Sequence, residues 1–113
     1  MMTPNAPEVP EISIDDAKEK LDAGGTVFVD VRDGDSYKEA RIDGAHNLSN
    51  ENIQEFLTNT AKDQPLVVYC YHGNSSKGAT QFLLSQGYSD VQSMSGGFEG
   101  WRMAYDYESG DDW

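Results

Sequence analysis

Two runs of mostly apolar residues stand out in an otherwise polar chain. Residues 26–31 read Thr-Val-Phe-Val-Asp-Val, and residues 66–69 read Leu-Val-Val-Tyr. Neither run alternates strictly between apolar and polar positions, and both are rich in residues that favour strands. This pattern is typical of strands that are buried on both faces, as in a parallel sheet. Shorter segments at 11–13, 45–48 and 91–94 predict three further strands.

Segments with apolar residues at helical spacing separate these predicted strands. Such spacing predicts helices over residues 14–23, 50–60 and 77–86, and glycines follow the first and the third of them. We expect one or two helical turns at 35–40 and a short helix around 98–101. Strands that alternate with helices favour an α/β domain with a mostly parallel sheet.

The length of 113 residues suits one domain with one hydrophobic core. Residues 1–10 contain three prolines, which predict an extended N-terminal arm. Residues 105–113 are acidic and aromatic without a periodic pattern, and we expect them to form a loose tail. The folded domain is therefore predicted to span residues 11–104.

The composition is strongly acidic, with 20 Asp and Glu against 8 Lys and Arg and a formal net charge of −12. Nucleic acids and anionic membranes bind clustered basic residues, so the charge argues against both as partners. No apolar run approaches the length of a membrane span, and the N-terminal segment lacks the regions of a signal peptide. A single cysteine cannot form an internal disulfide, which suits a reducing compartment. We therefore expect a cytoplasmic protein.

The single cysteine, Cys70, directly follows the apolar run at 66–69 and opens a polar loop before the helix expected from Lys77. Free backbone N–H groups gather where a strand leads through a short loop into a helix, and they favour anions. No Asp or Glu occurs from Gln64 to Ser89, so the loop lies in an acid-free stretch. A lone cysteine is often no more than a small buried hydrophobe. In this loop it is instead predicted to be a nucleophilic thiolate.

The residue types of the loop fit a cradle around the sulfur. Gly73 and Asn74 are the types that most readily take a positive φ, which a tight loop needs. Ser75 and Ser76 provide hydroxyl donors. The predicted site consists of Cys70 as the catalytic residue and a binding loop of Tyr71, His72, Gly73, Asn74, Ser75, Ser76 and Lys77.

Charged groups near the loop add to this prediction. Lys77 and a protonated His72 would add positive charge beside Cys70. Arg32 is expected to be a structural ion-pair partner of Asp30 or of another neighbour rather than a substrate ligand. One cysteine and two histidines supply too few ligands for a zinc site, so no metal is expected.

Four segments occur in the order found in one known family. They are Val29-Asp30-Val31-Arg32, the segment 41–48, the loop Cys-Tyr-His-Gly-Asn-Ser-Ser-Lys-Gly at 70–78, and Gly-Gly-Phe-Glu-Gly-Trp at 96–101. With these motifs the chain resembles the rhodanese-like sulfurtransferases, in particular their single-domain thiosulfate sulfurtransferases, from about residue 12 to residue 101. The resemblance implies a small parallel sheet of about five strands with helices on both faces.

The resemblance also implies a reaction in two steps. The Cys70 thiolate would take the outer sulfur of thiosulfate as a persulfide and release sulfite. The persulfide would then pass its sulfur to cyanide in an assay, or in the cell to a dithiol protein such as thioredoxin. No cofactor is implied.

Two other functions stay open. A phosphatase or an arsenate reductase also places a cysteine in such a loop, but it needs an arginine six residues later to grip the oxyanion. Ser76 occupies that position here, and Lys77 lies one residue too late. The second alternative is a non-catalytic rhodanese-like binding module, which usually lacks the cysteine that this chain retains.

Overall fold

The structure is a computed structural model that describes residues 9–109. Its centre is a five-stranded sheet in the order β1-β5-β4-β2-β3, and every pairing in it is parallel. The strands are β1 (Glu11–Ile12), β2 (Val27–Asp30), β3 (His46–Asn47), β4 (Leu66–Tyr69) and β5 (Val91–Met94). Each strand lies within the segment that the apolar pattern predicts, so the predicted fold class is confirmed.

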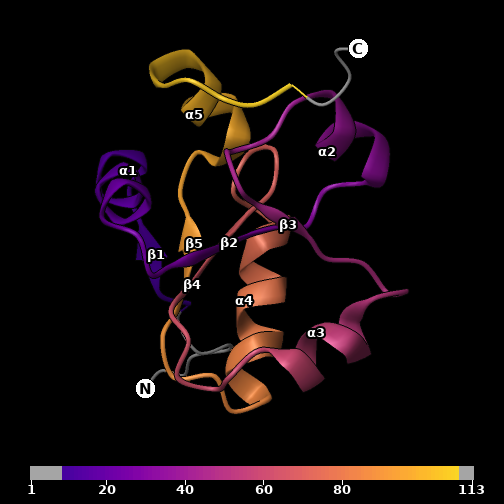
Figure 1. The fold of residues 1–113 in the computed structure, drawn as a ribbon. Coiled ribbons are helices and arrows are strands. Elements are labelled where there is room, and N and C mark those ends of the chain that lie inside the picture. The colour runs from indigo at the N-terminus through magenta and orange to yellow at the C-terminus, as the bar shows by residue number, and fades with distance from the viewer. Residues whose placement is uncertain (1–8, 110–113) are drawn as a thin grey trace, which may run out of the picture.

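Five helices cover the two faces of this sheet (Figure 1). They are α1 (Ile14–Ala23), α2 (Gly34–Glu39), α3 (Ile53–Asn59), α4 (Ser75–Ser85) and α5 (Gly97–Ala104). Residues of α1, α2 and α5 pack in one hydrophobic cluster, whereas residues of α3 and α4 pack in the other. The helices therefore lie on both faces, as the resemblance implies.

The two central strands divide their side chains between these clusters. Phe28 and Val67 belong to the cluster with α1 and α5, and their neighbours Val29 and Val68 belong to the cluster with α3 and α4. All four side chains are at most 2% exposed. Burial on both faces explains why these strands read as continuous apolar runs in the sequence.

The site is positioned by the carboxyl ends of β2 and β4. The register pairs Asp30 with Tyr69, so the loops that follow these strands begin side by side. Cys70 follows β4 directly, and Arg32 follows β2 after one residue. Crevices at the carboxyl ends of parallel strands are common ligand sites in open α/β sheets.

Two expectations about the ends of elements need correction. Helix α4 begins at Ser75 rather than at Lys77, because Ser75 and Ser76 already have helical backbone. Residues 105–109 are not loose: Arg41 and Glu108 exchange backbone hydrogen bonds of 2.9 and 2.7 Å, and their side chains form an ion pair. These polar contacts leave no trace in a hydrophobic pattern. The expected arm up to residue 8 and the tail after 109 lie outside the described residues.

Among residues 9–109, no helix has both the length and the apolar character that crossing a membrane requires.

Candidate active site

Cys70 lies in the loop between β4 and α4, and its residue is 5% exposed. Three hydrogen-bonding groups surround its sulfur. The backbone N–H groups of Gly73 and Ser76 lie 3.1 and 3.2 Å from Sγ, and the Ser76 Oγ lies 3.4 Å away. The predicted cradle of backbone N–H groups is thus present around a buried sulfur.

Opposing effects act on the ionisation of this thiol. Burial is the largest single influence and raises the pKa of Cys70. The Ser76 hydroxyl and the N–H groups of Ser76 and Gly73 lower it, and so does the N–H of His72. Together these hydrogen bonds outweigh burial, so the pKa of Cys70 lies below its ordinary value. The geometry therefore favours the thiolate.

The loop turns at a single residue of positive φ. Gly73 has a φ of 101°, and a Cβ there would lie 3.2 Å from the backbone nitrogen of Gly96. Asn74 was expected to share this conformation, but its φ of −93° is right-handed and leads directly into α4. One glycine is sufficient because α4 begins earlier than the sequence indicates.

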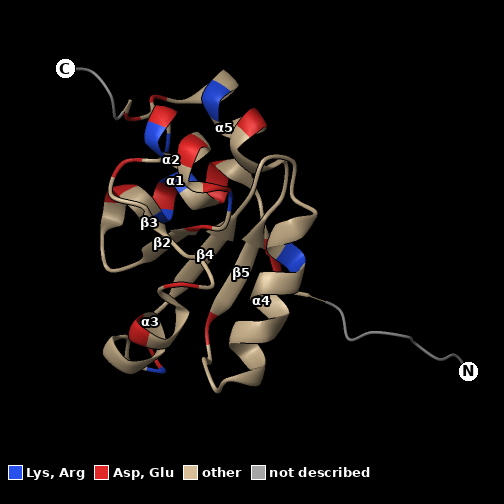
Figure 2. Ribbon diagram, turned by 90° about the vertical axis from the view of Figure 1, so that its right-hand side faces the viewer, with Lys and Arg blue, Asp and Glu red and all other residues tan. Residues whose placement is uncertain are grey.

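The charge expected from Lys77 is directed elsewhere. Its Nζ lies 3.4 Å from Oε2 of Glu11 on β1, and both side chains are close to half exposed. Figure 2 shows Asp and Glu spread over α1, α2, α3 and α5, whereas α4 carries none and has Lys77 as its basic residue. The acid-free stretch is real along the chain, but Glu11 approaches it from β1. A role of Lys77 in turnover stays a prediction.

A cavity of about 290 Å³ opens beside the sulfur. It is lined by loop residues and by the residues after β2: Val31, Arg32, Asp33, Cys70, Tyr71, His72, Asn74 and Ser75. Four of the predicted binding residues thus line the cavity with Cys70, while Gly73 and Ser76 lie against the sulfur itself. The wall from β2 was not predicted.

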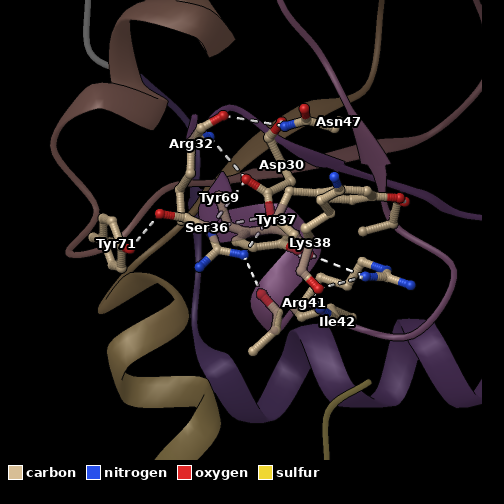
Figure 3. A network of polar contacts seen from close by, with 12 residues as sticks. Asp30, Arg32, Ser36, Tyr37, Lys38, Arg41, Ile42, Asn47, Tyr69 and Tyr71 are labelled. Carbon is tan, nitrogen blue, oxygen red and sulfur yellow. Dashed lines mark hydrogen bonds and ion pairs between the residues drawn. The ribbon is translucent and has the colours of Figure 1, made fainter. Parts of the chain in front are cut away.

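Arg32 belongs to this second wall of the cavity, and its side chain lies in a network of polar contacts (Figure 3). Its Nε and Nη2 donate to the Asp30 carboxylate, with a shortest distance of 2.7 Å, and Nη2 also donates to the Ala40 carbonyl. Both charged side chains are at most 3% exposed. The expected Asp30–Arg32 ion pair is confirmed.

Aromatic rings enclose the same guanidinium. Its central carbon lies 4.4 Å from the ring centre of Phe98 and 5.2 Å from that of Tyr71. The Tyr71 hydroxyl contacts Ser36 Oγ on α2 (Figure 3). Ser36 donates in turn to Asp33 Oδ1. These contacts fix Tyr71, which is 40% exposed, at the rim of the cavity.

The beginning of α5 holds the active-site loop from the other side. Phe98 N–H donates to the Cys70 carbonyl at 2.7 Å, and Glu99 N–H donates to the Tyr71 carbonyl at 3.0 Å. Gly97 has a φ of 58°, and a Cβ there would lie 2.3 Å from the Tyr71 carbonyl oxygen. The Gly-Gly pair at 96–97 therefore allows close backbone contact between α5 and the loop.

Ser93 on β5 is a neighbour of the site that sequence reasoning missed. Its Oγ lies 2.7 Å from Ser76 Oγ, and the residue is 1% exposed. The available signal was a polar residue inside a predicted strand. Its partner lies 17 positions away in the sequence, so the contact itself could not be read from the pattern.

The arrangement suits a nucleophilic sulfur and not the gripping of a large oxyanion by a side chain. The N–H groups of Gly73 and Ser76 point at Sγ, and the position of the phosphatase arginine is occupied by the buried Ser76. Within the described residues, no group of three or more His, Cys, Asp or Glu side chains is placed to hold a metal ion.

Comparison with known proteins agrees with this geometry. Residues 13–104 match the rhodanese-like domain. The chain is 45% identical over 93 residues to thiosulfate sulfurtransferase GlpE of Shewanella oneidensis, which covers 82% of this chain and 92% of the relative. It is 47% identical over 94 residues to the protein of that name from Pseudoalteromonas translucida, covering 83% and 90%.

A solved structure shows the same fold. The rhodanese-like domain of an Anabaena sp. protein, solved in solution, superimposes with a TM-score of 0.80 at 22% identity, covering 94% of this chain and 90% of that domain. The family match spans most of the chain, and the two relatives in sequence are matched over most of their own length. The chain therefore belongs to the rhodanese-like domain family.

Proposed function

We propose that this protein is a thiosulfate sulfurtransferase that carries sulfur as a persulfide on Cys70. The observation that carries the proposal is the convergence of two backbone N–H groups and one hydroxyl on Cys70 Sγ, in a cavity that opens to solvent. Both GlpE relatives are thiosulfate sulfurtransferases by name, which supports thiosulfate as the donor.

The first half-reaction is a displacement at sulfur. The Cys70 thiolate attacks the outer sulfur of thiosulfate, a new S–S bond forms, and the bond to the sulfonate sulfur breaks. Its electron pair leaves with sulfite, so one thiolate and one thiosulfate dianion give one persulfide anion and one sulfite dianion. The lowered pKa of Cys70 increases the fraction of the thiol that is ionised. The N–H groups at Sγ stabilise negative charge on the sulfur.

The second half-reaction regenerates the thiolate. A nucleophilic acceptor attacks the outer sulfur of the persulfide, and the electron pair of the S–S bond returns to Cys70 Sγ. Cyanide gives thiocyanate in this way. A dithiol protein such as thioredoxin first takes the sulfur as its own persulfide, and its second thiol then closes a disulfide and releases sulfide. Because Cys70 is only 5% exposed, a protein acceptor has to bring its thiol into the cavity.

Intact-mass measurement after incubation with thiosulfate tests the intermediate. We expect the protein to become heavier by one sulfur atom, and cyanide to remove that atom with the formation of thiocyanate. The control is Cys70→Ser, which should stay folded and gain no mass because the chain has no other cysteine. A wild-type mass that does not change, or a Cys70→Ser variant that still forms thiocyanate, would contradict the proposal.

The acceptor requires a separate measurement. Isolated persulfide protein is mixed with reduced thioredoxin, and the loss of the added sulfur is followed together with the release of sulfide. We expect reduced thioredoxin to remove the added sulfur and release sulfide. Thioredoxin whose thiols are blocked should remove none. Loss of the added sulfur at the same slow rate in both samples would contradict a dithiol protein as the acceptor. It would not affect the proposal for the first half-reaction.

The alternative phosphatase function is tested on the same preparation. The loop lacks an arginine at position 76, so bidentate binding of phosphate oxygens has no donor there. We expect no Cys70-dependent release of p-nitrophenol from p-nitrophenyl phosphate. Turnover that is abolished by Cys70→Ser would assign phosphatase chemistry instead.

A further inference from the structure

Ser93 connects the sulfur site to the strand at its back. Its hydroxyl lies 2.7 Å from Ser76 Oγ, which in turn lies 3.4 Å from Cys70 Sγ. Ser76 is fully buried, Ser93 is 1% exposed and Cys70 is 5% exposed. The three groups form a chain in which each member is held in a different element: the loop after β4, the first turn of α4, and β5.

The number of protons shared by Cys70, Ser76 and Ser93 determines the direction of the hydrogen bonds between them. When Cys70 is a thiol, its S–H can donate to Ser76 Oγ, and Ser76 can then donate to Ser93. When Cys70 is a thiolate, it only accepts, and the single proton of Ser76 is needed at the sulfur. Ser76 Oγ is then free to accept, and Ser93 is the neighbour that can donate to it.

A serine hydroxyl inside a helix has a competing partner. Ser76 lies in the first turn of α4, so its hydroxyl can donate to a nearby backbone carbonyl instead of to the sulfur. A donor that binds its oxygen from the opposite side holds the rotamer and strengthens the O–H as a donor, because hydrogen bonds in a chain polarise one another. Ser93 is placed on β5 to do both.

We propose that Ser93 is a positioning residue that directs the Ser76 hydroxyl to the Cys70 sulfur whenever that sulfur carries negative charge. It touches no substrate. Its kinetic consequences rest on the proposed function, whereas its effect on the thiolate does not.

The two half-reactions should respond differently. In the first, Ser93 increases the fraction of Cys70 that is thiolate, and high pH can replace that contribution. In the second, Cys70 Sγ is the leaving group and carries no proton in the persulfide, so high pH cannot replace the stabilisation. Loss of Ser93 should therefore slow the attack of Cys70 on thiosulfate mainly at low pH. It should slow the reaction of the persulfide with cyanide at every pH above the pKa of hydrogen cyanide.

The first test needs no sulfur chemistry. The rate of Cys70 alkylation by iodoacetamide is measured against pH in the wild type and in Ser93→Ala, by intact mass. We expect alkylation of Ser93→Ala to be about threefold to tenfold slower near neutral pH, with the two rates converging once the thiol is fully ionised. Ser93→Thr keeps a hydroxyl and should return most of the rate.

Thr80→Val is the matched control. Thr80 lies one turn after Ser76 in α4, is fully buried, and its Oγ1 has no hydrogen-bond partner among the described residues. Removing this hydroxyl preserves shape and deletes no link to the sulfur. We expect the alkylation profile of folded Thr80→Val to match the wild type.

The second test uses the half-reactions separately. We expect Ser93→Ala to approach the wild-type rate of persulfide formation at high pH while persulfide transfer to cyanide stays about threefold to tenfold slower. An unchanged alkylation profile in Ser93→Ala would overturn the proposal, and so would an equal change in Thr80→Val or a Ser93→Thr variant as impaired as Ser93→Ala. If Ser93→Ala shows the alkylation effect but the wild type forms no persulfide, the proposed role of Ser93 is supported and the proposed function is contradicted.

Discussion

Gly97 lies where α5 comes closest to the active-site loop. A Cβ at this position would lie 2.3 Å from the Tyr71 carbonyl oxygen and 2.7 Å from that of Cys70, and both neighbours are backbone atoms. Its φ of 58° adds strain for any side chain. The contact cannot relax by a rotamer change, so the loop or the helix has to move.

We therefore predict that Gly97→Ala destabilises the fold by about 2–4 kcal/mol and slows alkylation of Cys70. Urea denaturation and the alkylation rate measure the two effects. Gly78→Ala is the control, because a Cβ at Gly78 meets nothing within 4 Å and alanine favours the interior of a helix. Equal stability of the two variants would show that the loop does not depend on this close approach.

The lowered pKa of Cys70 also makes stability depend on pH. The folded protein holds the thiolate more readily than the unfolded chain, so ionisation stabilises the fold. This contribution is complete above the pKa of the unfolded thiol, about 8.5, and is lost as the pH falls through the lower folded pKa. We predict that the wild type gains stability relative to Cys70→Ser as the pH rises through this window. Urea midpoints of both proteins at several pH values measure it, and a constant difference would contradict a lowered pKa.

At the residue scale, the sequence identifies what is local and misses what is distant. Cys70, Gly73 and Ser76 are adjacent in one loop, and their residue types determine their roles at the sulfur. The ion pair of Lys77 with Glu11 could not be predicted, because Glu11 lies 66 positions earlier. Ser93 could not be placed for the same reason: parallel pairing brings together segments that are far apart in the chain.

At the scale of elements, the ion pair of Asp30 and Arg32 joins the end of β2 to three neighbours. Arg32 binds the Ala40 carbonyl after α2 and lies against rings of Tyr69 and Phe98. Burial alone would lower the pKa of Arg32, but the contact with Asp30 outweighs burial and raises it. The guanidinium therefore stays charged and keeps the second wall of the cavity in place.

We predict that Arg32→Met costs about 3–5 kcal/mol of stability, because it leaves the fully buried Asp30 carboxylate without its partner. The double variant Asp30→Asn, Arg32→Met should lose less than the single variant. The exposed pair Lys18–Asp22 is the control, and Lys18→Met should cost under about 1 kcal/mol. The test is the denaturant midpoint of the wild type, Arg32→Met, the double variant and Lys18→Met. A double variant that is less stable than Arg32→Met would contradict an unpaired buried charge as the cause.

The apolar pattern predicts strands and helices well where one face or both faces are buried. The runs at β2 and β4 are continuous because both of their faces are covered. It fails at ends that depend on polar contacts, as with the start of α4 at Ser75 and the pairing of Glu108 with Arg41. The packing of α5 against the loop was likewise beyond a pattern that records only local spacing.

For the whole molecule, the net charge of −12 acts on any anion that approaches. Acidic residues occur on α1, α2, α3 and α5 as well as on strands and loops, and Glu11 forms an ion pair with Lys77 next to the loop. This field extends about 30 Å at 0.01 M salt and about 8 Å at 0.15 M. Low salt should therefore disfavour thiosulfate, a dianion, before it reaches Cys70.

We predict that iodoacetate, which is anionic, alkylates Cys70 faster as salt rises from about 0.01 to 0.15 M, because screening weakens repulsion. Iodoacetamide is neutral and of similar size, so its rate should hardly change. The ratio of the two rates at each salt concentration is the measurement. A ratio that does not depend on salt would show that the molecular charge is not felt at the thiol.

The pairing of β1 with β5 joins residue 11 to residue 93, and α5 closes on Cys70 only through residues 97–99. A ribosome adds about 5–20 residues per second, so Cys70 is synthesised at least about a second before the last strand and helix exist. During that interval the N–H groups of α5 cannot hold the loop, and we expect the thiol to be an ordinary one. We therefore expect the active-site loop to be completed only after residues 97–99 have been added to the chain.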